Sequence, residues 1–242
     1  KKVVFVLLAL LLITACENNP TISNQQTTSW IFVANEGDYY ESDGSTIAFN
    51  GSISMINDFG DVYEIENVGS IVQSLEVYKN KLIVLINNSH KIKIYNITVD
   101  GLTLGIEIDT ENSSPREMVV IDDKIYFTNW ATQDVKVFNL VNYIIEDSIP
   151  LDGLPEGIML DGTDLWVTIN MNPDWSSANT VVKIDMNSNT VIEIIPVGEG
   201  PVALEKYNGD IYVSTTSYNN DFSIAYHGAS KDRKSTRLNS SH

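Results

Sequence analysis

The chain has 242 residues, 43% of them hydrophobic, and a formal net charge of -17 at pH 7. A surface this acidic repels nucleic acid and anionic lipid headgroups, so nucleic acid is not an expected partner. The single cysteine excludes an internal disulfide, and the three histidines are not spaced for zinc or nucleophilic chemistry, so no metal or other cofactor is expected.

Residues 1–15 have the pattern of a secretory signal peptide, because Lys1 and Lys2 precede an apolar run too short to span a bilayer. The run ends in Leu-Ile-Thr-Ala-Cys16, which resembles the bacterial lipobox. This resemblance implies a lipid on Cys16 and therefore a membrane as a partner; a buried cysteine behind an ordinary signal peptide is the alternative. Residues 16–29 are then the lipidated cysteine and a polar, flexible tether.

From residue 30 onward, short apolar runs alternate with turn residues, a pattern typical of antiparallel strands. Residues 114–153 contain four such runs, and the second of them, which begins at Lys124, recurs at Lys81, Asp164 and Asp210. A period of about 40–50 residues with four strands per repeat indicates a β-propeller. The sequence therefore predicts an all-β fold in which each four-stranded antiparallel repeat is one blade.

The predicted blades cover residues 30–69, 70–113, 114–153, 154–200 and 201–231. The first repeat lacks an inner strand, and the third strand of the fifth repeat is expected at residues 222–226. Residues 232–242 break the pattern and match the translation of a common sequencing adapter. We therefore expect this tail to be non-native and the chain to be a truncated propeller of roughly five blades; a natural basic tail is the alternative.

The second runs Ile125-Tyr-Phe-Thr-Asn129, Ile31-Phe-Val-Ala-Asn35 and Leu165-Trp-Val-Thr168 resemble the YVTN pattern of a family of bacterial β-propellers. The segment from Val33 to Gly37 resembles YncE-like surface lipoproteins of the Bacteroidetes type. The resemblance implies seven blades in the complete protein. It also implies a place in the bacterial cell envelope as an outer-membrane lipoprotein, periplasmic or surface-exposed. The implied partners are a corrinoid-like or glycan-like small ligand, or an outer-membrane transporter.

Two sets of residues are candidates for ligand binding. Loops that follow second strands share one face of a propeller, and here they are long or rich in aromatic and amide side chains, which suit stacking and hydrogen bonding. This loop set comprises Asn35, Glu36, Tyr39, Tyr40, Asn129, Trp130, Asn170, Trp175 and Tyr218. The axial set comprises Gln73, Arg116 and Glu156, which occupy equivalent starts of inner strands and differ from repeat to repeat.

Each set has a structural alternative. Trp130 would pack between blades, and the axial set would line a water-filled channel. The acidic loop at residues 36–50 offers oxygen ligands for calcium, although its spacing is not that of an EF-hand. The function we expect is non-catalytic ligand or partner binding by a surface-tethered propeller. The alternatives are a lactonase-type or quinoprotein-type enzyme with catalytic residues in further blades, and an envelope or adhesion scaffold.

Overall fold

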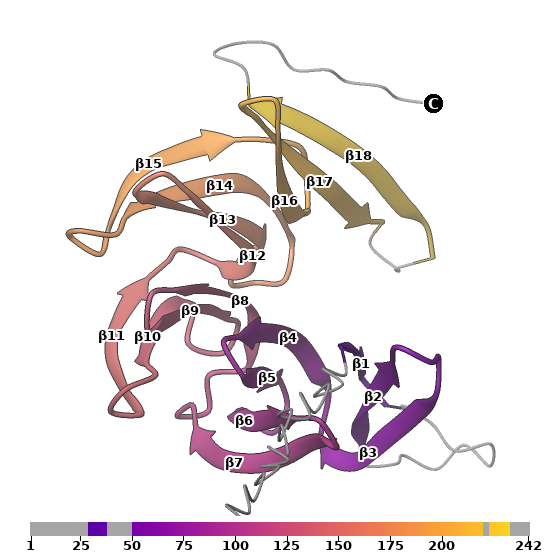
Figure 1. Ribbon diagram of the computed structural model, residues 1–242. Coiled ribbons are helices and arrows are strands. Elements are labelled where there is room, and N and C mark those ends of the chain that lie inside the picture. Colours follow the sequence, from indigo (N-terminus) through magenta and orange to yellow (C-terminus); the bar gives the residue numbers. More distant parts are fainter. Residues whose placement is uncertain (1–28, 38–49, 220–222, 233–242) are drawn as a thin grey trace, which may run out of the picture.

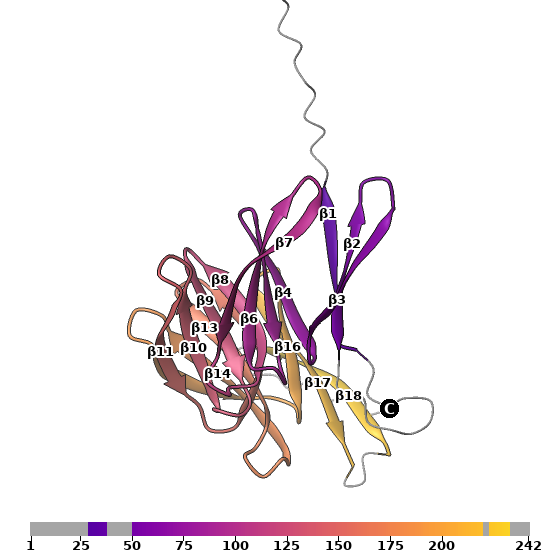
Figure 2. The same cartoon turned by 90° about the horizontal axis from the view of Figure 1, so that it is seen from below.

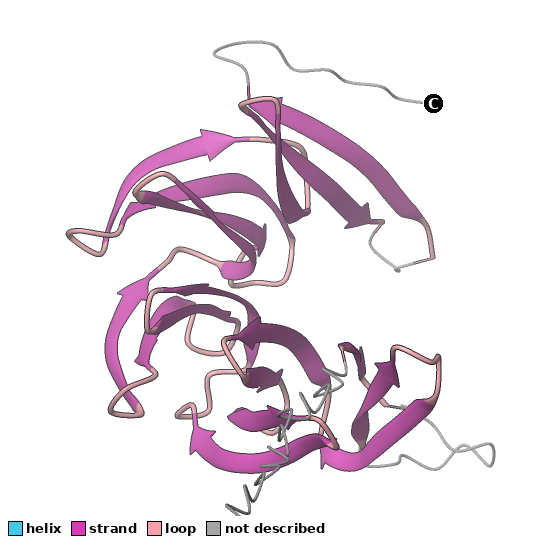
Figure 3. Cartoon of the chain, viewed as in Figure 1, coloured by secondary structure: helices cyan, strands magenta, loops and turns pink. Residues whose placement is uncertain are grey.

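The computed structural model describes residues 29–37, 50–219 and 223–232, and this part of the chain consists of strands and turns (Figure 3). Within these residues no helix is long and apolar enough to cross a membrane. The strands are β1 (Trp30–Asn35), β2 (Gly51–Asn57), β3 (Val62–Gly69), β4 (Val72–Tyr78), β5 (Lys81–Ile86), β6 (Lys91–Thr98), β7 (Gly101–Asp109), β8 (Pro115–Ile121), β9 (Lys124–Asn129), β10 (Asp134–Asn139), β11 (Ile144–Pro150), β12 (Leu154–Asp161), β13 (Asp164–Met171), β14 (Ser177–Asp185), β15 (Thr190–Pro196), β16 (Pro201–Tyr207), β17 (Asp210–Tyr218) and β18 (Ala225–Asp232).

The strands form five antiparallel sheets in which neighbours in sequence are neighbours in space. Blade 1 is β1–β3, blade 2 is β4–β7, blade 3 is β8–β11, blade 4 is β12–β15 and blade 5 is β16–β18. Figure 1 shows the blades following one another in an arc, with blades 1 and 5 at its ends, and Figure 2 shows the arc from below. The predicted repeat is confirmed, because β5, β9, β13 and β17 begin at the residues that the alignment of second strands gave.

The third strand of blade 5 differs from its prediction. It was expected at residues 222–226, but β18 spans Ala225–Asp232 and pairs with β17 from Tyr218 opposite Ala225 to Ile211 opposite Asp232. The segment from His227 to Ser230 lacks alternating apolar residues, so its sequence does not predict a strand. The position of β18 is determined by its pairing with β17. Asp232, with which the adapter match begins, is the last residue of β18.

The core is divided among the seams between blades. Alternate side chains of a strand point to opposite sheet faces, so β5, β9 and β13 each pack on both neighbouring blades. Phe127 of β9 is buried in the seam with blade 2, whereas the neighbouring Tyr126 is buried in the seam with blade 4. Further apolar clusters fill the seam between blades 1 and 2 and the seam between blades 4 and 5. Continuous apolar second strands therefore hold consecutive blades together.

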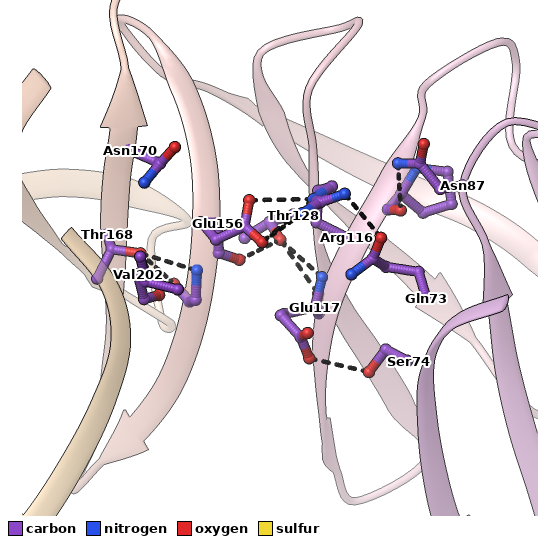
Figure 4. Close-up of polar contacts among 12 residues, drawn as sticks. Gln73, Ser74, Asn87, Arg116, Glu117, Thr128, Glu156, Thr168, Asn170 and Val202 are labelled. Atoms are coloured by element: carbon purple, nitrogen blue, oxygen red, sulfur yellow. Dashed lines mark hydrogen bonds and ion pairs between the residues drawn. The ribbon is translucent and has the colours of Figure 1, made fainter. Parts of the chain in front are cut away.

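Hydroxyl groups tie the inner strands to one another near the axis (Figure 4). Thr128 Oγ1 accepts a hydrogen bond from Glu117 N in its own blade (3.0 Å) and donates one to Glu156 O in the next blade (2.7 Å). Thr168, one repeat later, accepts from Gly157 N (2.7 Å) and donates to Val202 O (3.0 Å). The threonine of the YVTN-like pattern is therefore a structural bridge that sets the distance between inner strands.

Gly157 is required at a close approach between blades 4 and 5. A Cβ atom added to it would lie 2.3 Å from the carbonyl oxygen of Val202, well inside contact distance.

Candidate functional site

The axial set of predicted residues meets at one point. Arg116 of β8 lies between blades 2 and 4 and reaches both (Figure 4). Its Nε lies 3.0 Å from Glu156 Oε2, its Nη2 donates to Glu156 Oε1 at 2.6 Å, and its Nη1 donates to Gln73 Oε1 at 2.7 Å. The side chains of Arg116 and Glu156 are 18% and 9% exposed, so the ion pair is largely removed from water. Three inner strands thus contribute to one polar cluster.

Two predicted tryptophans continue this cluster toward the solvent. The Arg116 Cζ atom lies 4.2 Å from the centroid of the Trp130 ring, which is a cation–π contact. The rings of Trp130 and Trp175 meet edge to face, with centroids 5.9 Å apart and planes at 79°. Trp175 is 61% exposed, and so it forms the outer end of the stack. We call Gln73, Arg116, Glu156, Trp130 and Trp175 the axial site.

Turns fix the two tryptophans. Trp130 opens the turn between β9 and β10, and its backbone N–H donates to Ser114 O at 3.1 Å. Trp175 lies in the turn between β13 and β14, where Asn172 O accepts from its backbone N–H at 2.9 Å. Its φ of 68° is in the left-handed region, which is strained for a bulky residue and is often found at functional positions. The local chain therefore holds an exposed indole in a conformation that it does not favour.

A second polar contact lies beside the axial site, between Ser74 and Glu117 (Figure 4). Ser74 Oγ donates to Glu117 Oε2 at 2.9 Å, and burial raises the pKa of the Glu117 carboxyl above its usual value. The negative charge of Glu156 raises that pKa further, while the Ser74 hydrogen bond and the Arg116 charge oppose the shift. Sequence reasoning missed this pair, since a bulge in β8 between Pro115 and Met118 interrupts the regular alternation of side chains.

The predicted asparagines are held by backbone or hydroxyl contacts outside the Arg116 cluster. Asn170 Nδ2 donates to Pro201 O of the next blade at 3.2 Å, as Asn87 does to Pro115 O at 3.0 Å. Asn129 is fully buried and donates to Phe127 O at 3.0 Å. Asn35 is half-buried in blade 1 and donates to the hydroxyls of Ser52 and Ser54. These contacts give the asparagines a role in blade architecture.

The remaining predicted residues lie apart from the axial site or outside the described chain. Glu36 is exposed at the end of blade 1, and Tyr218 is 46% exposed at the end of β17. Tyr39, Tyr40, most of the acidic loop considered for calcium, and Cys16 fall outside the described residues. Among the residues that the structure does describe, no group of three or more His, Cys, Asp or Glu side chains is placed to hold a metal ion.

A separate groove of about 360 Å³ opens between the outer parts of blades 3 and 4. Its lining is mostly apolar and includes Leu151, Ile169, Val182 and Ile194. None of the predicted ligand-binding residues lines it. The groove and the axial site are therefore distinct places on the molecule.

The comparisons with known proteins establish the fold. No protein-family model and no curated protein matches the sequence. A Bacteroides caccae protein of unknown function has a similar structure, with a TM-score of 0.54 at 17% identity over 70% of this chain and 66% of that one. Kuenenia stuttgartiensis hydrazine synthase gives a TM-score of 0.61 at 15% identity over 83% of this chain and 64% of that one. A putative 6-phosphogluconolactonase from Bacteroides uniformis gives 0.57 at 11% identity over 83% and 68%.

The chain is a β-propeller. Antiparallel sheets in series, matched to solved propellers of this kind, leave no other fold class, and about five blades are present. At these identities the similarity concerns the fold alone. The chain spans about two thirds of the length of the Bacteroides caccae protein and of the hydrazine synthase chain.

Proposed function

We propose that this propeller is a non-catalytic binding protein, held at the bacterial cell envelope by a lipid on Cys16, and that it captures a small ligand or a protein partner at the axial site. One observation carries the proposal: polar residues from three inner strands and two tryptophans from neighbouring loops converge on one cluster. A channel lining of independent, water-facing residues would not need this convergence.

The composition of the axial site suits recognition. A partly exposed aromatic stack supplies apolar contact area at little cost in conformational entropy, and hydrogen-bonding groups beside it fix the orientation of a ligand. Trp175 supplies the exposed aromatic surface, and Arg116 with its hydrogen-bond partners supplies the polar groups.

The YVTN-like and YncE-like patterns support membership of that family and an outer-membrane location, periplasmic or surface-exposed. Similarity to a Bacteroides propeller agrees with this assignment at the level of the fold. On this basis the ligand is corrinoid-like or glycan-like, or the partner is an outer-membrane transporter that the propeller covers. The net charge of -17 favours these partners over nucleic acid.

The test is a thermal-shift screen in which the full chain is mixed with corrinoids, with oligosaccharides, or with soluble loops of an outer-membrane transporter. Trp175→Ala should remove the ligand-induced shift while it leaves the melting temperature of the free protein nearly unchanged, because the side chain is mostly exposed. Tyr207→Ala is the matched control, since Tyr207 is 65% exposed and lies at the end of β16 that leads into the β16–β17 turn. A ligand shift that survives Trp175→Ala would contradict the assignment.

A further inference from the structure

The charge of Arg116 is cancelled within the axial site, but its hydrogen-bonding capacity is not. A guanidinium has five N–H donors. Glu156 accepts from the N–H on Nε and from one of the two on Nη2, and Gln73 Oε1 accepts from one of the two on Nη1. By this count, two N–H groups of Arg116 have no acceptor among the residues that the structure describes. The cluster therefore offers donors without offering a net positive charge.

Two neighbours add donors of the same kind. The indole Nε1 of Trp130 is buried and has no hydrogen-bond partner in the described part of the chain. The carboxamide nitrogen of Gln73 likewise donates to no described residue, since Gln73 takes part only through Oε1. A buried donor without an acceptor, such as Trp130 Nε1, carries an energetic cost. A ligand that brings oxygen acceptors to this point would recover part of that cost.

The surroundings disfavour an anion as that acceptor. Glu156 already neutralises Arg116. The Glu117 carboxyl lies beside the same cluster, where it accepts a hydrogen bond from Ser74. Burial, and to a lesser extent the charge of Glu156, raise the pKa of Glu117, so a second carboxylate beside Glu156 is disfavoured in its charged form. The whole chain adds a field of the same sign. An acceptor that carries no charge meets the donors and avoids this repulsion.

We propose that the axial site selects an uncharged ring-shaped ligand through a carbonyl or hydroxyl oxygen. Arg116, Gln73 and Trp130 donate to that oxygen, and the exposed ring of Trp175 stacks on the ligand. This selectivity rests on the proposed function, because it concerns the same site. It goes further in naming the charge state and the functional group that the ligand must present.

Nicotinamide and nicotinate test the proposal, because they share one planar ring and differ in a neutral carboxamide against a carboxylate. The readout is the indole Nε1–H signal of Trp130 in ¹⁵N NMR spectra of the full chain, assigned with Trp130→Phe. Nicotinamide should shift this signal, and nicotinate should bind about tenfold or more weakly. Equal or tighter binding of nicotinate, or no response of the Trp130 signal to either compound, overturns the proposal.

Glu156→Gln tests the cause of the selectivity. The amide keeps the size of the side chain and an acceptor for Arg116 but removes the cancelling charge, so the preference should move toward nicotinate. The control is Glu193→Gln, an acid-to-amide change at a 58% exposed side chain on blade 4, which should leave the preference unchanged. An unchanged preference in Glu156→Gln overturns the proposal.

The two hypotheses fail in different ways. If nicotinate is preferred and Trp175→Ala abolishes its binding, the axial site is a binding site with a different selectivity. If Trp175→Ala changes neither the ligand-induced thermal shift nor the binding of either probe, the proposed function itself is wrong.

Discussion

Glu156 binds Arg116 through both Nε and Nη2 across the seam between blades 3 and 4, and each residue lies near the start of the inner strand of its blade. The pair is largely buried, so neither charge has water as a ready replacement for its partner. Because Trp130 covers the Arg116 guanidinium, the same pair also supports the aromatic stack that reaches the solvent.

Removal of one member of this pair should therefore be costly. Arg116→Leu leaves the Glu156 carboxylate buried without its cation, and we expect the free energy of unfolding to fall by about 3 kcal/mol. The double change Arg116→Leu with Glu156→Gln removes the stranded charge and should recover part of the loss. Urea denaturation measures both variants. Equal stability of the single and the double variant would show that the charge is not buried as the structure has it.

The threonine bridges should contribute to stability through their hydroxyl groups. Thr128→Val keeps the shape of the side chain but leaves Glu117 N and Glu156 O without a partner, which should cost about 1–3 kcal/mol. Thr128→Ser keeps the hydroxyl and is the matched control, and it should stay much closer to the wild type. The comparison is made by chemical denaturation. A valine variant as stable as the serine variant would contradict the role of the Thr128 hydroxyl as a bridge between inner strands.

Glu117 gives the protein a specific pH dependence. Its pKa is raised in the folded state, so the stability that this group contributes is fully present below its unfolded pKa and is lost as pH rises through its folded pKa. Glu117→Gln cannot lose a proton and should be more stable than the wild type near neutral pH, with a difference that vanishes in acid. Unfolding curves at a series of pH values test this.

Ser74→Ala provides a check on the same group. It removes a hydrogen bond that lowers the folded-state pKa of Glu117, while the unfolded pKa stays the same. The loss of stability with rising pH should therefore begin at the same pH as in the wild type, continue to a higher pH and be larger. A difference between Glu117→Gln and the wild type that does not depend on pH would contradict the account of Glu117.

The lipid anchor is open to a direct test in cells. Cys16→Ser removes the thiol that the lipobox-like segment would present for lipidation, and the protein should move from the membrane fraction to the soluble fraction. Fractionation with a blot for the protein measures this. Retention of Cys16→Ser in the membrane fraction would rule out a lipid on this cysteine.

The fold was predictable because the signals that define it are local and repeated. Strand starts at Lys81, Lys124, Asp164 and Asp210 were found from alternation and turn residues, and the structure begins a strand at each. The bounds of β18 were predicted wrongly, because its position depends on its pairing with β17 rather than on an apolar pattern of its own. Local periodicity gives a strand only where the strand itself carries apolar alternation.

The axial site was only partly predictable. Equivalent repeat positions placed Gln73, Arg116 and Glu156 near the axis, and their mutual contacts agree with that placement. The contact of Trp130 with Arg116 depends on the conformation of a turn, and the pairing of Ser74 with Glu117 depends on a bulge. Neither has a signature in one sequence, because the conformation of a turn and the position of a bulge do not show in local periodicity.

The position of a bound ligand tests the central claim most directly. A crystal structure of the full chain with a ligand from the thermal-shift screen should show that ligand stacked on Trp175 with an oxygen within hydrogen-bonding distance of Arg116. A ligand in the groove between blades 3 and 4, or elsewhere on the propeller with Trp175 uncovered, would contradict the account.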